Sequence, residues 1–98
     1  MPAAARKGDK CVPHCSPFNI KGASTSVFIN SKGASRVGDA VVSHLKFPPP
    51  GRGCSEHAPN ISSGSGTVFI DGKPAAFVGS KISGCTSVSG GSPDVFID

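Results

Sequence analysis

One short hydrophobic phrase, written three times, constrains this chain more than any other feature. Val-Phe-Ile followed by Asn or Asp occurs at residues 27–30, 68–71 and 95–98. β-Branched and aromatic residues favour strands, so each copy predicts a short strand that ends in a turn. A small chain that repeats one strand–turn unit three times is expected to fold with approximate threefold symmetry and to suit a partner that is itself a trimer.

The repeat extends beyond this strand. A shift of 41 positions lays residues 27–38 over residues 68–79, with seven of the twelve positions identical. A shift of 30 lays residues 4–9 over residues 34–39, so the N-terminus carries the second half of the unit, while residues 91–98 carry the first half. The two ends together therefore make up the third copy, which predicts that the termini are adjacent.

Composition favours an all-β fold. The 98 residues include 13 glycines and 9 prolines, and no stretch has the apolar spacing of an amphipathic helix. Asp71-Gly72 is a strong signal for a two-residue hairpin turn, in which both central residues take a positive φ. We expect the returning strands at residues 34–37 and 75–78, where small side chains allow close packing around an axis. The prediction is one domain over residues 1–98, built of short β-hairpins.

Metal-binding side chains recur in the phase of the repeat. His14, His44 and Cys85 each lie five residues past the Gly-Asp turn or, in the third unit, past Gly-Ser. Threefold symmetry brings them together near the axis, and His57 can complete a tetrahedral set. Three His and one Cys suit Zn²⁺ in a closed structural site, which stabilises a domain too small to fold well alone. The predicted cofactor is structural zinc, although the ligands alone do not distinguish zinc from iron.

A rival ligand set follows from local spacing. Cys11 and His14, and again Cys54 and His57, form Cys-x-x-His pairs, and together they make a Cys₂His₂ site. We favour the repeat-phased set because it uses all three His and follows from the symmetry. Under that set Cys11, Cys15 and Cys54 are left over, either as thiols or with two of them in a disulfide.

Charge and hydropathy limit the remaining functions. The formal net charge is +4, but the lysines are scattered along the sequence and no aromatic stacking platform accompanies them. We therefore predict a solvated basic surface and no nucleic-acid partner, with a small zinc-binding nucleic-acid or adaptor module as the alternative. No apolar stretch has the length of a signal peptide or a membrane span, which predicts a cytoplasmic protein that leaves the cell, if at all, without a standard signal.

The chain resembles the PAAR-repeat proteins along essentially its whole length. The resemblance rests on residues 3–9, 32–39 and 72–80 and on the phrases at 65–76 and 91–97. It implies a small conical β-fold with a metal site near the vertex, whose three His and one Cys map onto His14, His44, His57 and Cys85. No copy of the motif is unaltered: the second reads Gly-Ala-Ser-Arg, and the third has Phe77 and Ser80 in place of Arg and Asp. We interpret these motif residues as turn and packing elements.

The resemblance also implies a mechanical function without catalysis. PAAR-repeat proteins form the membrane-puncturing tip of a trimeric β-helical spike, VgrG-like or of a phage tail, in type VI secretion systems and related contractile tails. We expect one chain per trimer, seated by β-augmentation and apolar packing, with only transient contact with the target membrane. The protein is expected in the cytoplasm before assembly, then at the spike tip outside the cell or in the virion. Because family members that are enzymes carry that activity on an added domain and this chain ends at Asp98, we expect no enzymatic activity. The predicted partner-binding residues are Val27, Phe28, Ile29, Val68, Phe69, Ile70, Val95, Phe96 and Ile97.

Overall fold

The chain folds into short strands held around a common axis. The structure, a computed structural model, describes residues 1–98 except 14–16, 47–54 and 58, and it describes the strands β3 and β4 by their backbone alone. The described residues form no helix, and so none that could cross a membrane. This confirms the all-β prediction. The strands are β1 (Phe28–Ile29), β2 (Lys32–Gly33), β3 (His44–Lys46), β4 (Ser55–His57), β5 (Phe69–Ile70) and β6 (Lys73–Pro74).

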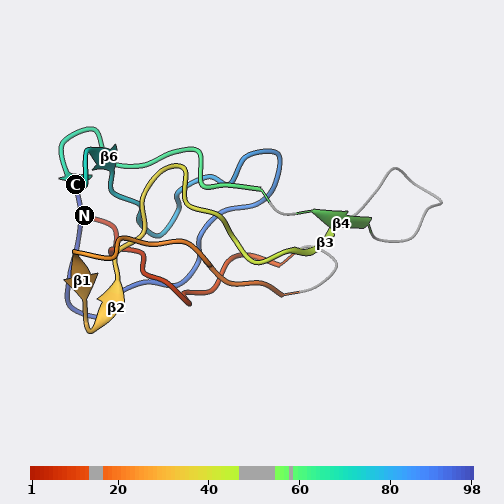
Figure 1. The fold of residues 1–98 in the computed structure, drawn as a ribbon, viewed down its shortest axis with the longest axis horizontal. Coiled ribbons are helices and arrows are strands. Elements are labelled where there is room, and N and C mark those ends of the chain that lie inside the picture. Colours follow the sequence, from red (N-terminus) through yellow and green to blue (C-terminus); the bar gives the residue numbers. More distant parts are fainter. Residues whose placement is uncertain (14–16, 47–54, 58) are drawn as a thin grey trace.

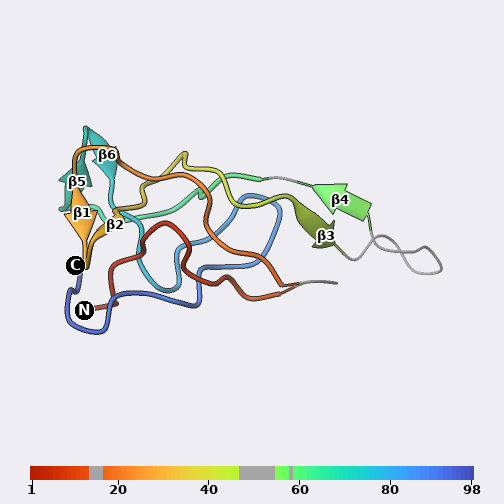
Figure 2. The ribbon, with the colours of Figure 1, turned by 60° about the horizontal axis from the view of Figure 1, so that its bottom comes forward.

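The strands form three antiparallel pairs, β1 with β2, β3 with β4, and β5 with β6. Figures 1 and 2 show β1, β2, β5, β6 and both chain ends at one end of the molecule, which we call the base, whereas β3 and β4 extend at the opposite end. Repeated hairpins thus build the base, whereas the β3–β4 pair at the opposite end has no counterpart among the described residues of the other units.

Two-residue turns close both hairpins at the base. Asn30 and Ser31 have φ of 54° and 67°, and Asp71 and Gly72 have φ of 53° and 79°. Two successive positive values are what a type I′ turn requires, and its twist matches that of the strands on either side. The hairpin predicted at Asp71-Gly72 is confirmed, and its repeat-mate forms the same turn without a glycine.

The two chain ends together build the third copy of this hairpin. Ala3 pairs with Phe96, as Gly33 pairs with Phe28 in β1–β2 and Pro74 pairs with Phe69 in β5–β6. The amide of Ile97 donates to the carbonyl of Pro2 at 2.8 Å. The prediction that the termini are adjacent is therefore confirmed.

A closed ring of backbone hydrogen bonds joins the three units. The amide of Ala5 donates to the carbonyl of Ala76 at 3.0 Å, that of Ala76 to Ser35 at 2.9 Å, and that of Ser35 to Ala5 at 3.0 Å. All three residues are fully buried. Only small side chains fit where three backbones approach this closely, which confirms the reason given for the small residues of the repeat.

The returning strands differ from the prediction. They are β2 and β6, each two residues long, and the segments expected to return, 34–37 and 75–78, instead pair with neighbouring units. The pairs are Arg6 with Ala34, Arg36 with Ala75, and Phe77 with Ala4. The chain leaves its own hairpin after two residues because the ring at the axis requires each segment to face the next unit, so the sequence pattern showed the strand but not its partner.

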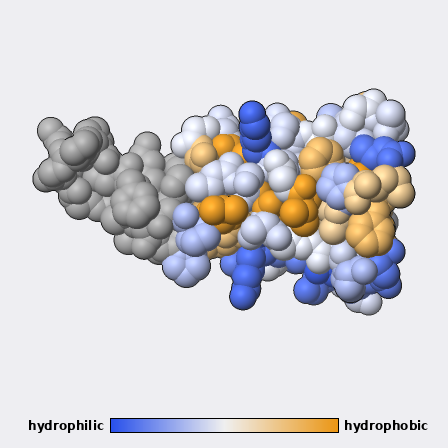
Figure 3. Space-filling model, turned by 180° about the vertical axis from the view of Figure 1, so that it is seen from behind, coloured by the Kyte–Doolittle hydropathy of each residue, from blue (hydrophilic) through white to orange (hydrophobic). Residues whose placement is uncertain are grey.

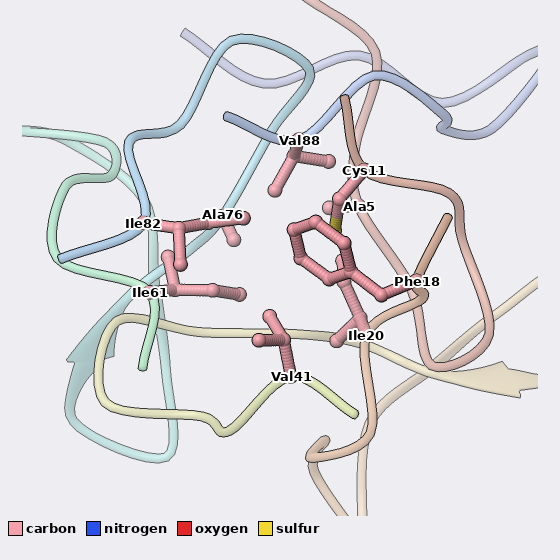
Figure 4. Close-up of a cluster of buried hydrophobic side chains, with 9 residues drawn as sticks. All are labelled: Ala5, Cys11, Phe18, Ile20, Val41, Ile61, Ala76, Ile82 and Val88. Atoms are coloured by element: carbon pink, nitrogen blue, oxygen red, sulfur yellow. The ribbon is translucent and has the colours of Figure 1, made fainter. Parts of the chain in front are cut away.

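The main hydrophobic core lies next to this ring. Its buried residues are Ala5, Cys11, Phe18, Ile20, Val41, Ile61, Ala76, Ile82 and Val88. Figure 4 shows their side chains converging from all three units, with the ring of Phe18 among them. Three backbone bridges join the units in this core: Cys11 pairs with Val88, Ile20 with Val41, and Ile61 with Ile82. Each unit contributes one residue to a bridge with each of its two neighbours, so the three bridges form a closed cycle. A second, smaller core at the base contains Ala4, Ala34, Ile70, Ala75 and Ile97.

Candidate partner surface and metal centre

The three Val-Phe pairs expose six large apolar side chains at the base. Phe28 is 60% exposed, Phe69 56% and Phe96 50%, and the valine before each is also exposed. In Figure 3, where the base lies at the right, apolar residues reach the surface there beside hydrophilic ones. Exposure of an aromatic in every one of the three units is unusual for a small domain and indicates an interaction surface. We call Val27, Phe28, Val68, Phe69, Val95 and Phe96 the base patch.

The isoleucines of the same phrases point inward. Ile70 and Ile97 are 7% and 5% exposed and belong to the base core, and Ile29 is partly buried against it. The nine residues expected to bind a partner therefore divide into two groups. Val and Phe are available at the surface, whereas Ile anchors the phrase to the fold.

A serine organises each approach to the base patch. The hydroxyl of Ser24 accepts hydrogen bonds from the amides of Ser26 and Val27 at 3.1 and 2.9 Å. Ser65 and Ser92 make the corresponding bonds in the other two units. These turns hold the backbone rigid just before the exposed Val-Phe pair, so the surface is preorganised.

Buried ion pairs brace two of the three units. In the first unit Arg6 donates to Asp9 from its amide at 2.7 Å and from its guanidinium at 3.0 and 2.8 Å, and it also reaches Asn30 at 3.0 Å. In the second unit Arg36 makes the same three bonds to Asp39 at 2.7 to 2.9 Å and bonds Asp71 at 2.9 Å. The hydrogen bonds to these carboxylates raise the pKa of both arginines. Each pair ties the turn at the axis to a hairpin at the base.

Hydrogen bonds and a nearby charge also lower the pKa of two carboxylates at the base. Hydrogen bonds from Ser24 and Ser26, with the charge of Arg36, lower the pKa of Asp71 below its ordinary value. Hydrogen bonds from Asn30 and Ser92 do the same to the pKa of Asp94. Both carboxylates are thus held in the ionised form next to the base patch.

The third unit replaces the ion pair with an apolar and a hydroxyl residue. Phe77 packs against the base core, and its amide donates to the hydroxyl of Ser80 at 3.0 Å, as the amide of Arg36 donates to Asp39. Phe77 and Ser80 are the two departures of the third unit from the motif. The sequence signal for this replacement is that Arg and Asp stand three positions apart in two units, whereas in the third unit both positions change together, to Phe and Ser.

The predicted metal ligands divide between described and undescribed parts of the chain. His44 and His57 are direct partners in the register of β3 and β4, which in an antiparallel pair sets their Cα atoms about 5 Å apart. His14 and Cys54 lie outside the described residues. Among the side chains that are described, no three of His, Cys, Asp and Glu gather at one point. The pairing of two predicted ligands from distant parts of the sequence is compatible with a shared metal.

The two described cysteines occupy different environments. Cys85 is partly buried at the edge of the main core, and its sulfur lies 4.0 Å from the hydroxyl of Thr86. Cys11 is buried in the core, where the repeat places Val41 and Ile82 in the other units. Burial, together with the nearby Cys85 thiol and Asp9 carboxylate, raises the pKa of Cys11 to about 12. Cys11 therefore packs as a small apolar residue of the core.

Comparison with known proteins agrees with the repeats. Residues 53–98 match the family model of the PAAR motif. Two curated relatives from Pseudomonas aeruginosa, the NAD(P)(+) glycohydrolase toxin Tse6 and the (p)ppApp synthetase toxin Tas1, are each 36% identical over 74 residues. The aligned part covers 76% of this chain and 17% of either relative. With its motif, its repeats and its strand-only fold, this chain is a PAAR-repeat protein.

Proposed function

We propose that this protein is the non-enzymatic tip of a membrane-puncturing spike, and that its base caps the end of a trimeric β-helical spike protein. PAAR proteins associate with the VgrG spikes of type VI secretion systems, and a contractile phage tail offers the same kind of trimer. One chain seats on one trimer, because the three hairpins of the base stand in for three separate partners.

The observation that carries the proposal is the base patch. Three Val-Phe pairs are exposed at one end of a chain whose units are joined by a closed hydrogen-bond ring. A trimeric β-helix ends in three open strand edges and an apolar interior, which pair with unwanted partners unless covered. The short strands β1 and β5 belong to two-stranded sheets, and each can add to such an edge while its Phe fills the apolar centre.

We further propose that His14, His44, His57 and Cys85 hold a structural zinc at the end opposite the base. The register of His44 against His57 and the core environment of Cys11 support this set over the Cys-x-x-His pairs. Bound there, the metal would cross-link β3 and β4 to the first and third units and supply folding free energy. A closed set of four protein ligands gives rigidity rather than reactivity.

We assign no catalysis to this chain. The names of the two relatives describe toxins with enzymatic activities, but the aligned segment amounts to 17% of each. What this chain shares with them is the PAAR-bearing segment, and the function proposed for it is accordingly structural. Transit from the cytoplasm to the spike tip follows from assembly on the spike.

The mass of the complex with a trimeric spike protein tests the cap. Native mass spectrometry should find one chain per trimer. Replacing Phe28, Phe69 and Phe96 together by Ser should abolish the complex, because each loses an apolar contact worth up to about 1.5–3 kcal/mol when fully buried. Replacing Val12 and Val42 by Ser is the matched control, since both are over 40% exposed yet lie away from the base patch. Three chains per trimer, or equal loss in the control, would refute the proposal.

A further inference from the structure

An open pocket lies beside the base on one of the three flanks of the molecule, and two lysines make this flank basic. It has a volume of about 410 Å³ and lies next to Phe28 and Gly33 of the first hairpin. Lys7 and Lys21 both line it, and both are exposed. The amide of Gly8 donates to the carbonyl of Ile20 at 2.9 Å. This bond holds the two lysines, 14 positions apart in the sequence, on neighbouring backbone segments.

The repeat shows what stands at the same place on the other two flanks. Lys7 corresponds to Val37 and Val78, and Lys21 corresponds to Ser62 and Ser89. The amides of Lys7, Val37 and Val78 donate equivalent hydrogen bonds to carbonyls of the next unit, at 2.8 to 2.9 Å. The three positions are therefore equivalent in backbone structure as well as in the sequence repeat. The two valines are only partly exposed, and they pack over glycines, since a methyl group added at Gly64 or Gly91 would lie within 3 Å of them. On the first flank the residue in phase with these glycines is Ala23, which lines the pocket together with the two lysines.

The charge of the lysine pair is not neutralised within the described part of the chain. Each ion pair found there uses an arginine: Arg6 holds Asp9, and Arg36 holds Asp39 and Asp71. Two carboxylates lie against pocket residues, Asp71 through its hydrogen bond with Ser24 and Asp39 beside Gly22, and both are already bonded to Arg36. The pocket therefore offers two ammonium groups, the hydroxyl of Thr25 and the apolar surface of Phe28.

We propose that this pocket binds one acidic segment of a partner protein, so that the threefold cap carries a single, off-axis docking site. Two ammonium groups next to an apolar edge complement a peptide that carries carboxylates beside a small apolar side chain. A volume of about 410 Å³ is within the range of sites for small ligands and single peptide side chains. A bilayer would meet all three flanks alike, whereas the lysine pair is confined to one flank and to the base end, and this step rests on the proposed function, in which that end meets a protein partner.

Peptide binding to the intact chain tests this without any spike protein. A short fluorescein-labelled peptide of Glu, Asp and Leu should bind with a stoichiometry of one, and the affinity should fall as salt is raised. Replacing Lys7 by Val and Lys21 by Ser copies the second flank and should weaken binding about tenfold, as expected for the loss of two charge contacts. Replacing Lys10 and Lys81 by Ala removes the same charge elsewhere on the surface, at positions where the second unit has Ala40, and should change binding less than about twofold.

The converse substitutions provide a gain of function. Replacing Val37 and Ser62 by Lys should create a second site, so that two peptides bind per chain. The proposal is overturned if both lysine-removal variants lose affinity equally, because binding is then a general effect of charge. It is also overturned if anionic vesicles or single-stranded DNA bind at Lys7 and Lys21 more tightly than the peptide, or if no peptide binds at low salt. Success or failure here is independent of the cap stoichiometry, which is measured with a spike trimer.

Discussion

The joint change of Arg and Asp to Phe and Ser in the third unit makes a quantitative prediction about the second. Arg36 and Asp39 have side chains only 12% and 8% exposed, and two guanidinium hydrogen bonds at 2.9 Å join them. Asp39→Ser removes both bonds and leaves the guanidinium with Asp71 alone. Arg36→Phe leaves the carboxylate with a single backbone donor. Breaking a buried ion pair from either side costs about 3–5 kcal/mol, because a charge is left without compensation.

The double substitution Arg36→Phe with Asp39→Ser should behave differently. It removes both charges at once and reproduces Phe77 and Ser80, a solution that this chain already uses on the same backbone. Replacement of a buried ion pair by apolar residues is often neutral. We therefore expect the free energy of unfolding to fall by only about 1 kcal/mol, which reflects the hydrogen bond that Asp71 loses. The two single effects should therefore be strongly non-additive.

Calorimetry suits this double-mutant cycle, since the chain has no Trp or Tyr for fluorescence. A loss of 1 kcal/mol lowers the melting temperature of a domain this size by about 4–8 °C, so either single variant should melt more than about 12 °C below the parent. The double variant should recover most of that difference. The same cycle at Arg6 and Asp9 is the matched control, because its hydrogen bonds have the same pattern. Additive effects, with the double variant the least stable, would refute the reasoning.

Three shorter predictions address the metal, a turn and pH. Cys85→Ser should abolish bound zinc, whereas Cys11→Val should retain it, because the repeat places valine or isoleucine at that core position; zinc analysis of both purified variants would contradict the ligand set if only Cys11→Val lost metal. Ser31→Gly should raise the melting temperature, because its φ of 67° strains any residue with a Cβ by up to about 1 kcal/mol; no rise on calorimetry would argue against that strain. Since the folded pKa of Asp71 is lowered, its charge stabilises the fold above about pH 4 and the contribution is lost as pH falls further; the difference in melting temperature between the parent and Asp71→Asn should shrink on acidification, and a constant difference would contradict this.

Repeat phase predicted more of this fold than propensity did. Aligning the copies of one phrase was enough to expect adjacent termini and small residues at the axis, while the Asp-Gly dipeptide predicted the turn at Asp71-Gly72, and the structure has all three. Strand pairing could not be predicted in the same way. Period-two alternation describes one isolated strand, whereas these segments leave their own hairpin after two residues to bond with the next unit.

The candidate sites show the same division. The phrase Val-Phe-Ile predicted an interface. Which of its residues face outward depends on the base core, because only the isoleucines turn toward that core. Lys7 and Lys21 looked like scattered surface charges because nothing in the sequence brings them together. A hydrogen bond between Gly8 and Ile20 does so in the fold. Sequence symmetry thus predicted what the three units share, and the structure was needed to find where one of them differs.

The position of the termini allows a last, demanding prediction. Asp98 is in phase with Asn30 and Asp71, and Met1 is in phase with Ser31 and Gly72. The two end residues are thus the two halves of a missing type I′ turn, and a bond between the flanking residues Ile97 and Pro2 is already in place. Joining Asp98 to the N-terminus, with Met1→Gly, should therefore form a third Asp-Gly hairpin turn without strain.

Closure of a ring of this length removes chain entropy from the unfolded state that is worth up to about 4 kcal/mol, so the cyclised chain should melt more than about 10 °C above the linear one. A cyclised chain that lacks residue 1 is the control, because Asp98 bonded directly to Pro2 leaves no two-residue turn and should gain much less. Equal melting temperatures for the two rings would mean that the chain ends do not occupy the phase of the repeat. The third hairpin would then be an accident of adjacency rather than a copy of the other two.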